Sequence, residues 1–456
     1  SWEVSASSLH RLTGFSSDSS DHYTMDGDRQ AVCRNWSMPS LACAAVMGLL
    51  GTAGILTAPM AAAHGQAHAT TAEGFTLDAG VAATFRSNIE EATSLWQIPG
   101  RLMGGEAEPP ESGFALDDAN IGAGFKHASG VIAGGELATH HGGEAEIEQA
   151  YAGYRAGWGI AEDRNWQIAA GRLKPAFSPE LSRHASQREF SENRLLDDAF
   201  YGGHYQDDGL QSLLVAGSWT AGIELWSGDS YPATSGSGGG AQDLFTYWSG
   251  ELGGGQWRLG GWAFQARADD RQDDRLETGH SHGGTLVAND DPVRFDGRER
   301  HLGLHADTTF PVVGSGMAWH LAAEFILASV TGDLRDTTRT ATLDGDYQGY
   351  WVQPAVSWDG GRHHLALRYE RLRLDNHLSG PGAAILAESS GLQNAGDDPE
   401  RLGLSYRFHP IRYSAESGDW HRLGVRLEWT HRDDGITEDY VGIGMVFAAE
   451  ERFTIR

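Results

Sequence analysis

The feature that most constrains this chain is an alternation of apolar and polar residues over segments of about ten residues. In 401–409 every even-numbered position is apolar and every odd-numbered position is charged, small or polar. The same pattern recurs in 213–225, 317–328, 350–358, 422–430 and 440–447. Successive side chains of a strand point to opposite faces, so the pattern predicts strands with one apolar and one polar face.

The pattern predicts sixteen strands, within a range of 14 to 18. The expected strands lie near 75–85, 120–126, 130–138, 146–157, 165–173, 199–206, 211–226, 243–250, 255–266, 299–309, 316–329, 347–358, 363–373, 400–409, 421–431 and 437–447. A division of 211–226 at Gly217 stays open.

The connections between these strands alternate between short and long. Long ones follow the odd-numbered strands, at 86–119, 174–198, 227–242, 267–298, 330–346 and 374–399. Transmembrane barrels have short periplasmic turns and long outer loops, whereas a soluble sandwich has no reason to sort its loops by strand parity. Only a closed barrel pairs every backbone group of strands in lipid. We therefore expect an all-β, antiparallel transmembrane barrel.

A segment with the features of a secretory signal sequence precedes the predicted barrel. Residues 41–63 form an apolar run that follows Arg29 and Arg34 and ends in small residues, which is the layout of a cleaved signal peptide. A single membrane anchor is the alternative. We expect residues 1–69 to be removed and residues 70–456 to form a barrel in the bacterial outer membrane.

If the apolar positions face lipid, the residues between them face the interior. This parity places Arg368, Arg401, Arg407 and Arg426 in the lumen. Arginines along a pore raise the local concentration of anions. The alternative is that they pair with inward carboxylates such as Glu370 and only stiffen the wall.

Residues 174–198 follow the fifth predicted strand and form the third outer loop. This loop carries Arg183, Arg188 and Arg194 together with several carboxylates. Folded inward, it narrows the pore with charges of both signs. The alternative is a loop that caps the mouth of the barrel.

One stretch of the sequence resembles a known family. Residues 166–211 read WQIAAGRLKPAFSPELSRH…REFSENRLLDDAFYGGHYQDDGLQ. This resembles the phosphate-selective porin O and P family, in which a similar strand end precedes a loop and an aromatic-rich strand that ends in Asp-Gly. The resemblance implies a sixteen-stranded homotrimer that passes anions, with Arg172 and Lys174 in the carried-over positions.

The other sequence features favour a channel over a nucleic-acid-binding protein or an enzyme. A net charge of -28 argues against nucleic-acid binding, and the sequence contains no phosphate-binding loop and no dinucleotide-binding fingerprint. We expect no enzyme activity and no cofactor; the partners would be small, anionic solutes, outer-membrane lipid and lipopolysaccharide. A zinc-linked porin is the alternative, followed by a barrel hydrolase or an adhesin. The metal-site candidates for the zinc-linked reading are His140, His141, His280 and His282.

Overall fold

The computed structural model describes residues 73–89, 96–158, 164–233, 240–273, 275, 291–393, 398–414 and 420–454. They all belong to one unit of the chain, Ile55–Arg456. The predicted signal peptide and its boundary at residue 69 lie outside the described residues. Among the residues that are described, no helix is long and apolar enough to cross a membrane.

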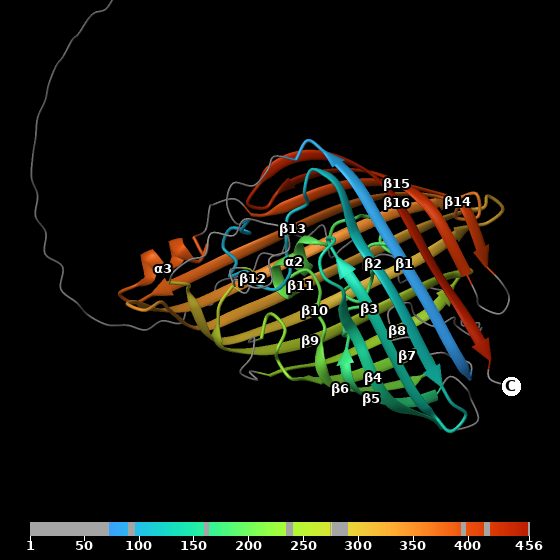
Figure 1. Ribbon diagram of the computed structural model, residues 1–456, viewed down its shortest axis with the longest axis horizontal. Coiled ribbons are helices and arrows are strands. Elements are labelled where there is room, and N and C mark those ends of the chain that lie inside the picture. Colours follow the sequence, from blue (N-terminus) through green and yellow to red (C-terminus); the bar gives the residue numbers. More distant parts are fainter. Residues whose placement is uncertain are drawn as a thin grey trace, which may run out of the picture. The chain divides into compact units, whose positions relative to one another are not determined.

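Sixteen antiparallel strands form a closed barrel (Figure 1), which confirms the predicted fold class. The strands are β1 (Gly74–Ser87), β2 (Gly113–Lys126), β3 (Val131–His140), β4 (Glu146–Gly157), β5 (Arg164–Leu173), β6 (Asp207–Ala216), β7 (Trp219–Trp226), β8 (Ala241–Leu252), β9 (Gly255–Arg271), β10 (Arg294–Val312), β11 (Met317–Arg335), β12 (Thr340–Trp358), β13 (His363–Ser379), β14 (Glu400–Ser414), β15 (Trp420–Asp433) and β16 (Thr437–Thr454). Two short helices are α2 (Leu195–Tyr201) and α3 (Ala383–Ser389).

Closure is made by β1, which pairs with both β2 and β16. Val81 of β1 faces Ala119 on one side and Phe447 on the other. Each strand is hydrogen-bonded to its neighbours in chain order around the wall. A closed sheet has no free edge, so every wall strand has partners on both sides.

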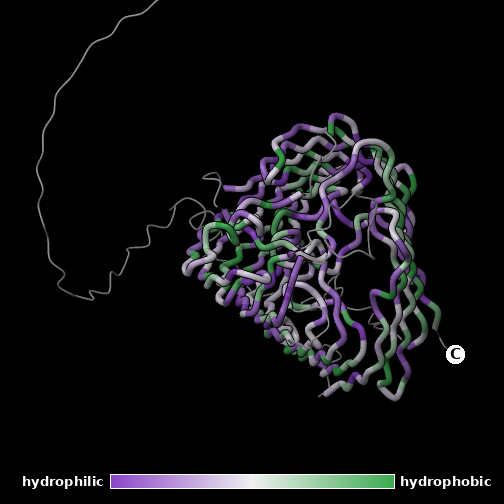
Figure 2. Tube along the Cα trace, turned by 60° about the vertical axis from the view of Figure 1, so that its left-hand side comes forward, coloured by the Kyte–Doolittle hydropathy of each residue, from purple (hydrophilic) through white to green (hydrophobic). Residues whose placement is uncertain are grey.

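The apolar face of the strands points outward. Leu404, Leu427 and Met445 are 43%, 45% and 60% exposed, while their neighbours Ser405 and Arg426 are buried. Figure 2 shows the resulting alternation of hydrophobic and hydrophilic residues along the strands. A face that is apolar and exposed on nearly every wall strand suits hydrocarbon and not water.

The height of this apolar band matches a bilayer. On β1 the outward side chains run from Phe75, which packs on Phe125 with ring centroids 4.9 Å apart, to Phe85. Ten residue steps of about 3.3 Å give a length of about 33 Å along the strand, or about 25 Å of height at the usual strand tilt. Aromatic residues at both ends of the band form the girdles of such barrels. The protein is a bacterial outer-membrane barrel.

The predicted strand count is right, but one of the expected strands is wrong. The expected strand 199–206 begins inside α2 and ends in a loop. The expected strand 211–226 divides at Gly217, the alternative that the sequence left open, into β6 and β7, which are joined by a tight turn at 217–218. The hairpin inverts the expected facing of β6, so that Leu213 points inward and Leu214 points outward.

The predicted outer loop 330–346 is also wrong, because β11 and β12 run through it and leave only 336–339 as a turn. Asp333 pairs with Thr342 in this part of the ladder, and the Thr342 hydroxyl donates to the Asp333 carboxylate at 3.0 Å. The strands here extend past the apolar band. They therefore lack the outward apolar residues on which the sequence pattern depends.

Candidate functional site in the barrel interior

Residues 174–206, called loop L3 below, join β5 to β6 and lie inside the barrel. The Ser191 amide donates to Glu428 of β15 at 3.0 Å, and the Leu195 amide donates to Glu370 of β13 at 2.7 Å. These strands lie across the barrel from β5 and β6, where the loop starts and ends. L3 therefore crosses the interior instead of capping the mouth.

Aromatic side chains of L3 pack against the inner face of the wall beside β9. Phe177 and Tyr201 of L3 are buried against Trp262 and Phe264 of β9, with ring centroids 4.9 Å apart for Phe177–Trp262 and 5.7 Å for Tyr201–Phe264. Aromatic pairs of this kind contribute about 0.5–1.5 kcal/mol beyond their buried area. The expectation of a uniformly polar inner face is wrong for the wall from β8 to β12.

The first outer loop packs on top of L3. Arg101 forms an ion pair with Glu299 of β10 at 2.6 Å and donates to the carbonyl of Ala199 in α2 at 2.6 Å. Gly105 approaches Gly202 so closely that a Cβ at Gly105 would lie 2.7 Å from the Gly202 Cα, and both glycines have positive φ. The described part of the loop between β1 and β2 thus packs against L3 and helps to hold it inside the barrel.

The four wall arginines predicted from strand parity are buried and point inward. Each forms an ion pair, and two of the partners, Asp198 and Glu189, belong to L3. The pairs are Arg368–Glu370 at 2.7 Å, Arg401–Asp198 at 2.9 Å, Arg407–Glu189 at 2.6 Å and Arg426–Asp117 at 3.2 Å. This is the paired arrangement that the sequence left open as an alternative, and it ties the loop to the wall.

The loop residues named from the sequence lie at different places. Arg183 pairs with Glu180 at 2.5 Å, and Arg188 donates to Asn193 at 2.5 Å. Arg194 bridges Asp197 at 2.6 Å and Glu324 at 3.1 Å, and its guanidinium lies 4.8 Å from the Trp351 ring centroid. Arg172 is set apart from these residues, because on β5 it shares the face of the exposed Trp166 and Ala170.

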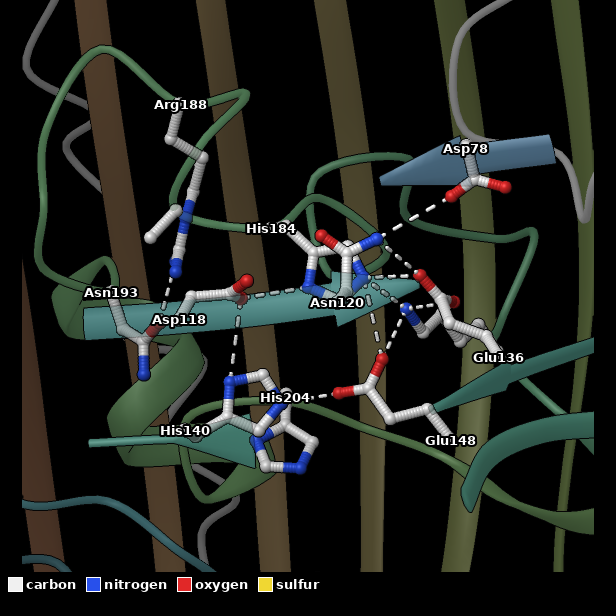
Figure 3. A network of polar contacts seen from close by, with 12 residues as sticks. Asp78, Asp118, Asn120, Glu136, His140, Glu148, His184, Arg188, Asn193 and His204 are labelled. Atoms are coloured by element: carbon white, nitrogen blue, oxygen red, sulfur yellow. Dashed lines mark hydrogen bonds and ion pairs between the residues drawn. The ribbon is translucent and has the colours of Figure 1, made fainter. Parts of the chain in front are cut away.

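Lys174 and His184 anchor L3 to β2, β3 and β4 (Figure 3). The Lys174 ammonium lies 2.7 Å from Glu136 and 2.5 Å from Glu148. His184 contacts Asp118 at 2.7 Å and Glu136 at 2.6 Å. Burial and the Lys174 charge act to lower the pKa of His184, but the two carboxylates outweigh them and raise this pKa to about 10. The imidazole is therefore cationic at neutral pH.

The predicted histidine candidates separate in the structure. His140 contacts Glu148, and its ring lies 4.8 Å from the ring of His204. Burial lowers the pKa of His204, which keeps this ring neutral at pH 7. His141 lines both the small pocket beside these rings and a larger cavity next to L3. His280 and His282 lie outside the described residues.

Sequence reasoning missed Glu136, Glu148, Asp118 and His204. The first three are acidic residues on the inward face of β2, β3 or β4. Strand parity could have revealed these carboxylates, because a charge that faces neither lipid nor bulk water needs a partner. His204 carries no such signal, since its position depends on the path of L3.

A cavity of about 590 Å³ lies beside L3, toward β1, β14 and β15. Its lining carries both signs of charge, from Arg86, Arg401 and Arg432 and from Glu192 and Asp198. A space of this size holds a small hydrated solute. The arrangement can therefore bind or pass small polar molecules between L3 and the wall.

The chain is similar to solved structures of outer-membrane proteins. No family model and no curated protein matches the sequence. The similar structures include OprB of Pseudomonas putida (12% identity, 84% of this chain and 94% of that chain, TM-score 0.45), the outer membrane channel DcaP of Acinetobacter baumannii (15%, 84% and 99%, 0.42) and the anion-selective porin of Comamonas acidovorans (10%, 83% and 98%, 0.39). Similarity at this level concerns the fold and not the solute.

Proposed function

We propose that the protein is an outer-membrane porin that lets small hydrophilic solutes cross by passive diffusion. The observation that carries the proposal is the combination of a sixteen-strand barrel, apolar outside, with a loop that crosses its interior beside a charged cavity. A barrel of sixteen strands is wide enough for an aqueous channel. L3 then sets the size of the passage, and no catalysis is part of the proposal.

Planar lipid bilayers test this function. Purified protein is expected to insert and produce stepwise, ohmic current increments in potassium chloride. Folded protein that inserts without conducting would contradict a porin. The proposal includes removal of residues 1–69 and assembly of three chains, which N-terminal sequencing and native mass spectrometry of the outer-membrane form would check.

A preference for small anions, phosphate among them, is the finer part of the proposal. At the end of the barrel with short turns, Arg422 packs on Trp420 with its guanidinium 5.2 Å from the ring centroid, and Arg412 faces it across the β14–β15 ladder. In the described part of the chain, Arg422 forms no close ion pair with a carboxylate, and its Nε has no hydrogen-bond partner. An arginine without a paired carboxylate attracts anions more strongly than a paired one.

Arg422→Gln is expected to reduce the ratio of chloride to potassium permeability, by about twofold for the loss of one charge. The reversal potential across a salt gradient measures this ratio. Arg164→Gln, which changes an exposed arginine on the outer face of β5, is the matched control and should leave the potential unchanged. An equal shift in both variants, or in neither, would remove the anion proposal while leaving the channel in place.

The selectivity is also expected to depend on pH through α2. Burial raises the pKa of Asp197 and of Asp198 to about 6, although Arg194 and Arg401 act in the opposite direction. These carboxyls become neutral as the pH falls through about 6, whereas in an unfolded chain they do so near 4. The folded form therefore gains stability from them on acidification, and L3 loses negative charge.

Anion preference should then rise between pH 7 and pH 5. Asp198→Asn is expected to show at pH 7 much of the preference that the unaltered protein gains at pH 5, and to respond less to pH. Asp208→Asn, at an exposed position of β6, is the control. A reversal potential that stays constant from pH 7 to pH 5 in the unaltered protein would show that these carboxyls do not act on the passage.

A further inference from the structure

Three side chains with nitrogen and oxygen donors meet where L3 returns to the wall. His140 ends β3, Glu148 lies on β4, and His204 follows α2 (Figure 3). Their donor atoms all lie within 4.8 Å of one another, and His140 Nε2 already contacts Glu148 Oε1. Two imidazoles and one carboxylate are a ligand set typical of zinc sites.

A small enclosed space adjoins these donors. Its volume is about 30 Å³, and His140, Glu148, His204 and Glu106 are among the residues that line it. This exceeds the roughly 10–15 Å³ that one water molecule needs, so a single ion fits. Glu106 lies 3.6 Å from His204 Nε2, which places a further carboxylate within reach of a fourth coordination position.

Neighbouring residues hold the donors in place. Asp118 lies 3.5 Å from Nδ1 of His140, on the side of the ring that faces away from Glu148. The Lys174 ammonium holds the other oxygen of Glu148 at 2.5 Å. A carboxylate behind a histidine ligand fixes its orientation and its tautomer, as is usual around bound zinc.

A second set of donors nearby is already filled. Glu136, Glu148 and His184 also lie within reach of one another. The Lys174 ammonium stands among them, 2.7 Å from Glu136, 2.5 Å from Glu148 and 2.9 Å from His184 Nε2. A metal ion there would have to displace the Lys174 ammonium that both carboxylates hold, and the cationic His184 ring offers it no lone pair, so this second set is not the site.

We propose that His140, Glu148 and His204 bind one divalent transition-metal ion of the zinc type. The ion takes the place of the hydrogen that His140 and Glu148 share, and it joins the end of L3 to β3 and β4. Zinc thereby stabilises the returning end of the loop against the wall. This site goes beyond solute diffusion, because it would bind its ion whether or not the barrel conducts.

Calorimetric titration of the chelator-treated, folded protein with zinc chloride tests the site. One ion per chain is expected for the unaltered protein, with affinity at least tenfold weaker in His204→Ala and in His140→Ala. His127→Ala, in the turn between β2 and β3, is the matched control and should bind like the unaltered protein. A change in SDS-gel migration on heating verifies that each variant is folded.

Cobalt provides a second measurement that does not depend on affinity. Cobalt bound by two imidazoles and one or two carboxylates in a four-coordinate site is expected to give strong visible absorption, absent in His204→Ala. No zinc binding by the unaltered protein, or binding that neither histidine variant weakens, would overturn the proposal. Neither result would bear on conductance, so the porin function and the metal site fail separately.

Discussion

Replacement of L3 by a four-residue glycine–serine turn is expected to raise the single-channel conductance by on the order of threefold or more. L3 crosses from β5 to the opposite wall, where Ser191 and Leu195 meet Glu428 and Glu370. Its removal opens the cross-section that the loop and its aromatic side chains fill. Conductance in planar bilayers measures the change.

The fold permits this deletion without disturbing the wall. Leu173 and Asp207, the residues on either side of L3, are register partners in the β5–β6 ladder, so a short hairpin turn can join them. Shortening the loop around α3, whose main contacts among the labelled elements are with β12 and β13 and not with α2 of L3, is the control and should leave conductance unchanged. An L3 deletion that is folded but conducts like the unaltered protein would show that the passage does not run past this loop.

The outer face of the barrel could be predicted from the sequence because every second residue of a strand in lipid has to be apolar. In β14, Leu404 faces hydrocarbon while Ser405 and Arg407 face the interior, and this contrast repeats in β15 and β16. The signal is local, since each strand carries its own pattern. It fails where a strand leaves the membrane, as β11 and β12 do at their outer ends.

The inner face could be predicted only in part, because its character depends on L3. β9 carries aromatic residues on both of its faces. Trp257 points to the outside of the barrel, whereas Trp262 and Phe264 point to the inside. The inner pair is apolar because Phe177 and Tyr201 of L3 pack there. Nothing within β9 itself distinguishes a side chain that faces lipid from one that faces an apolar loop.

The arginines of the site were predictable, but their partners were not. Parity alone places Arg407 inside the barrel, whereas its partner Glu189 lies 218 positions earlier in the chain. The same holds for Arg401 and Asp198. Such pairs arise when a loop folds across a closed sheet, so the sequence leaves open whether an inward arginine meets solute or carboxylate. The path of L3 brings a carboxylate to each of these two arginines.

Val81→Arg is expected to lower the free energy of unfolding by about 2–4 kcal/mol, the cost of an arginine on the lipid face at the middle of the bilayer. Val81 is 41% exposed and lies midway between the aromatic ends of the apolar band on β1. No inward side chain is altered, so the cost arises from hydrocarbon alone. Urea unfolding in lipid vesicles, followed by tryptophan fluorescence, measures it.

Phe75→Arg places the same charge at the end of the apolar band, where the guanidinium reaches the lipid head groups. The charge itself is then expected to lower the free energy of unfolding by only about 0–1 kcal/mol, apart from the loss of the aromatic contact. The comparison separates a membrane from water as the medium outside the barrel. In water, both exposed positions would accept arginine with little loss, and Phe75, which packs on Phe125, would be the more sensitive of the two. A larger loss at Phe75 than at Val81 would therefore contradict the placement of the hydrocarbon core at the middle of β1.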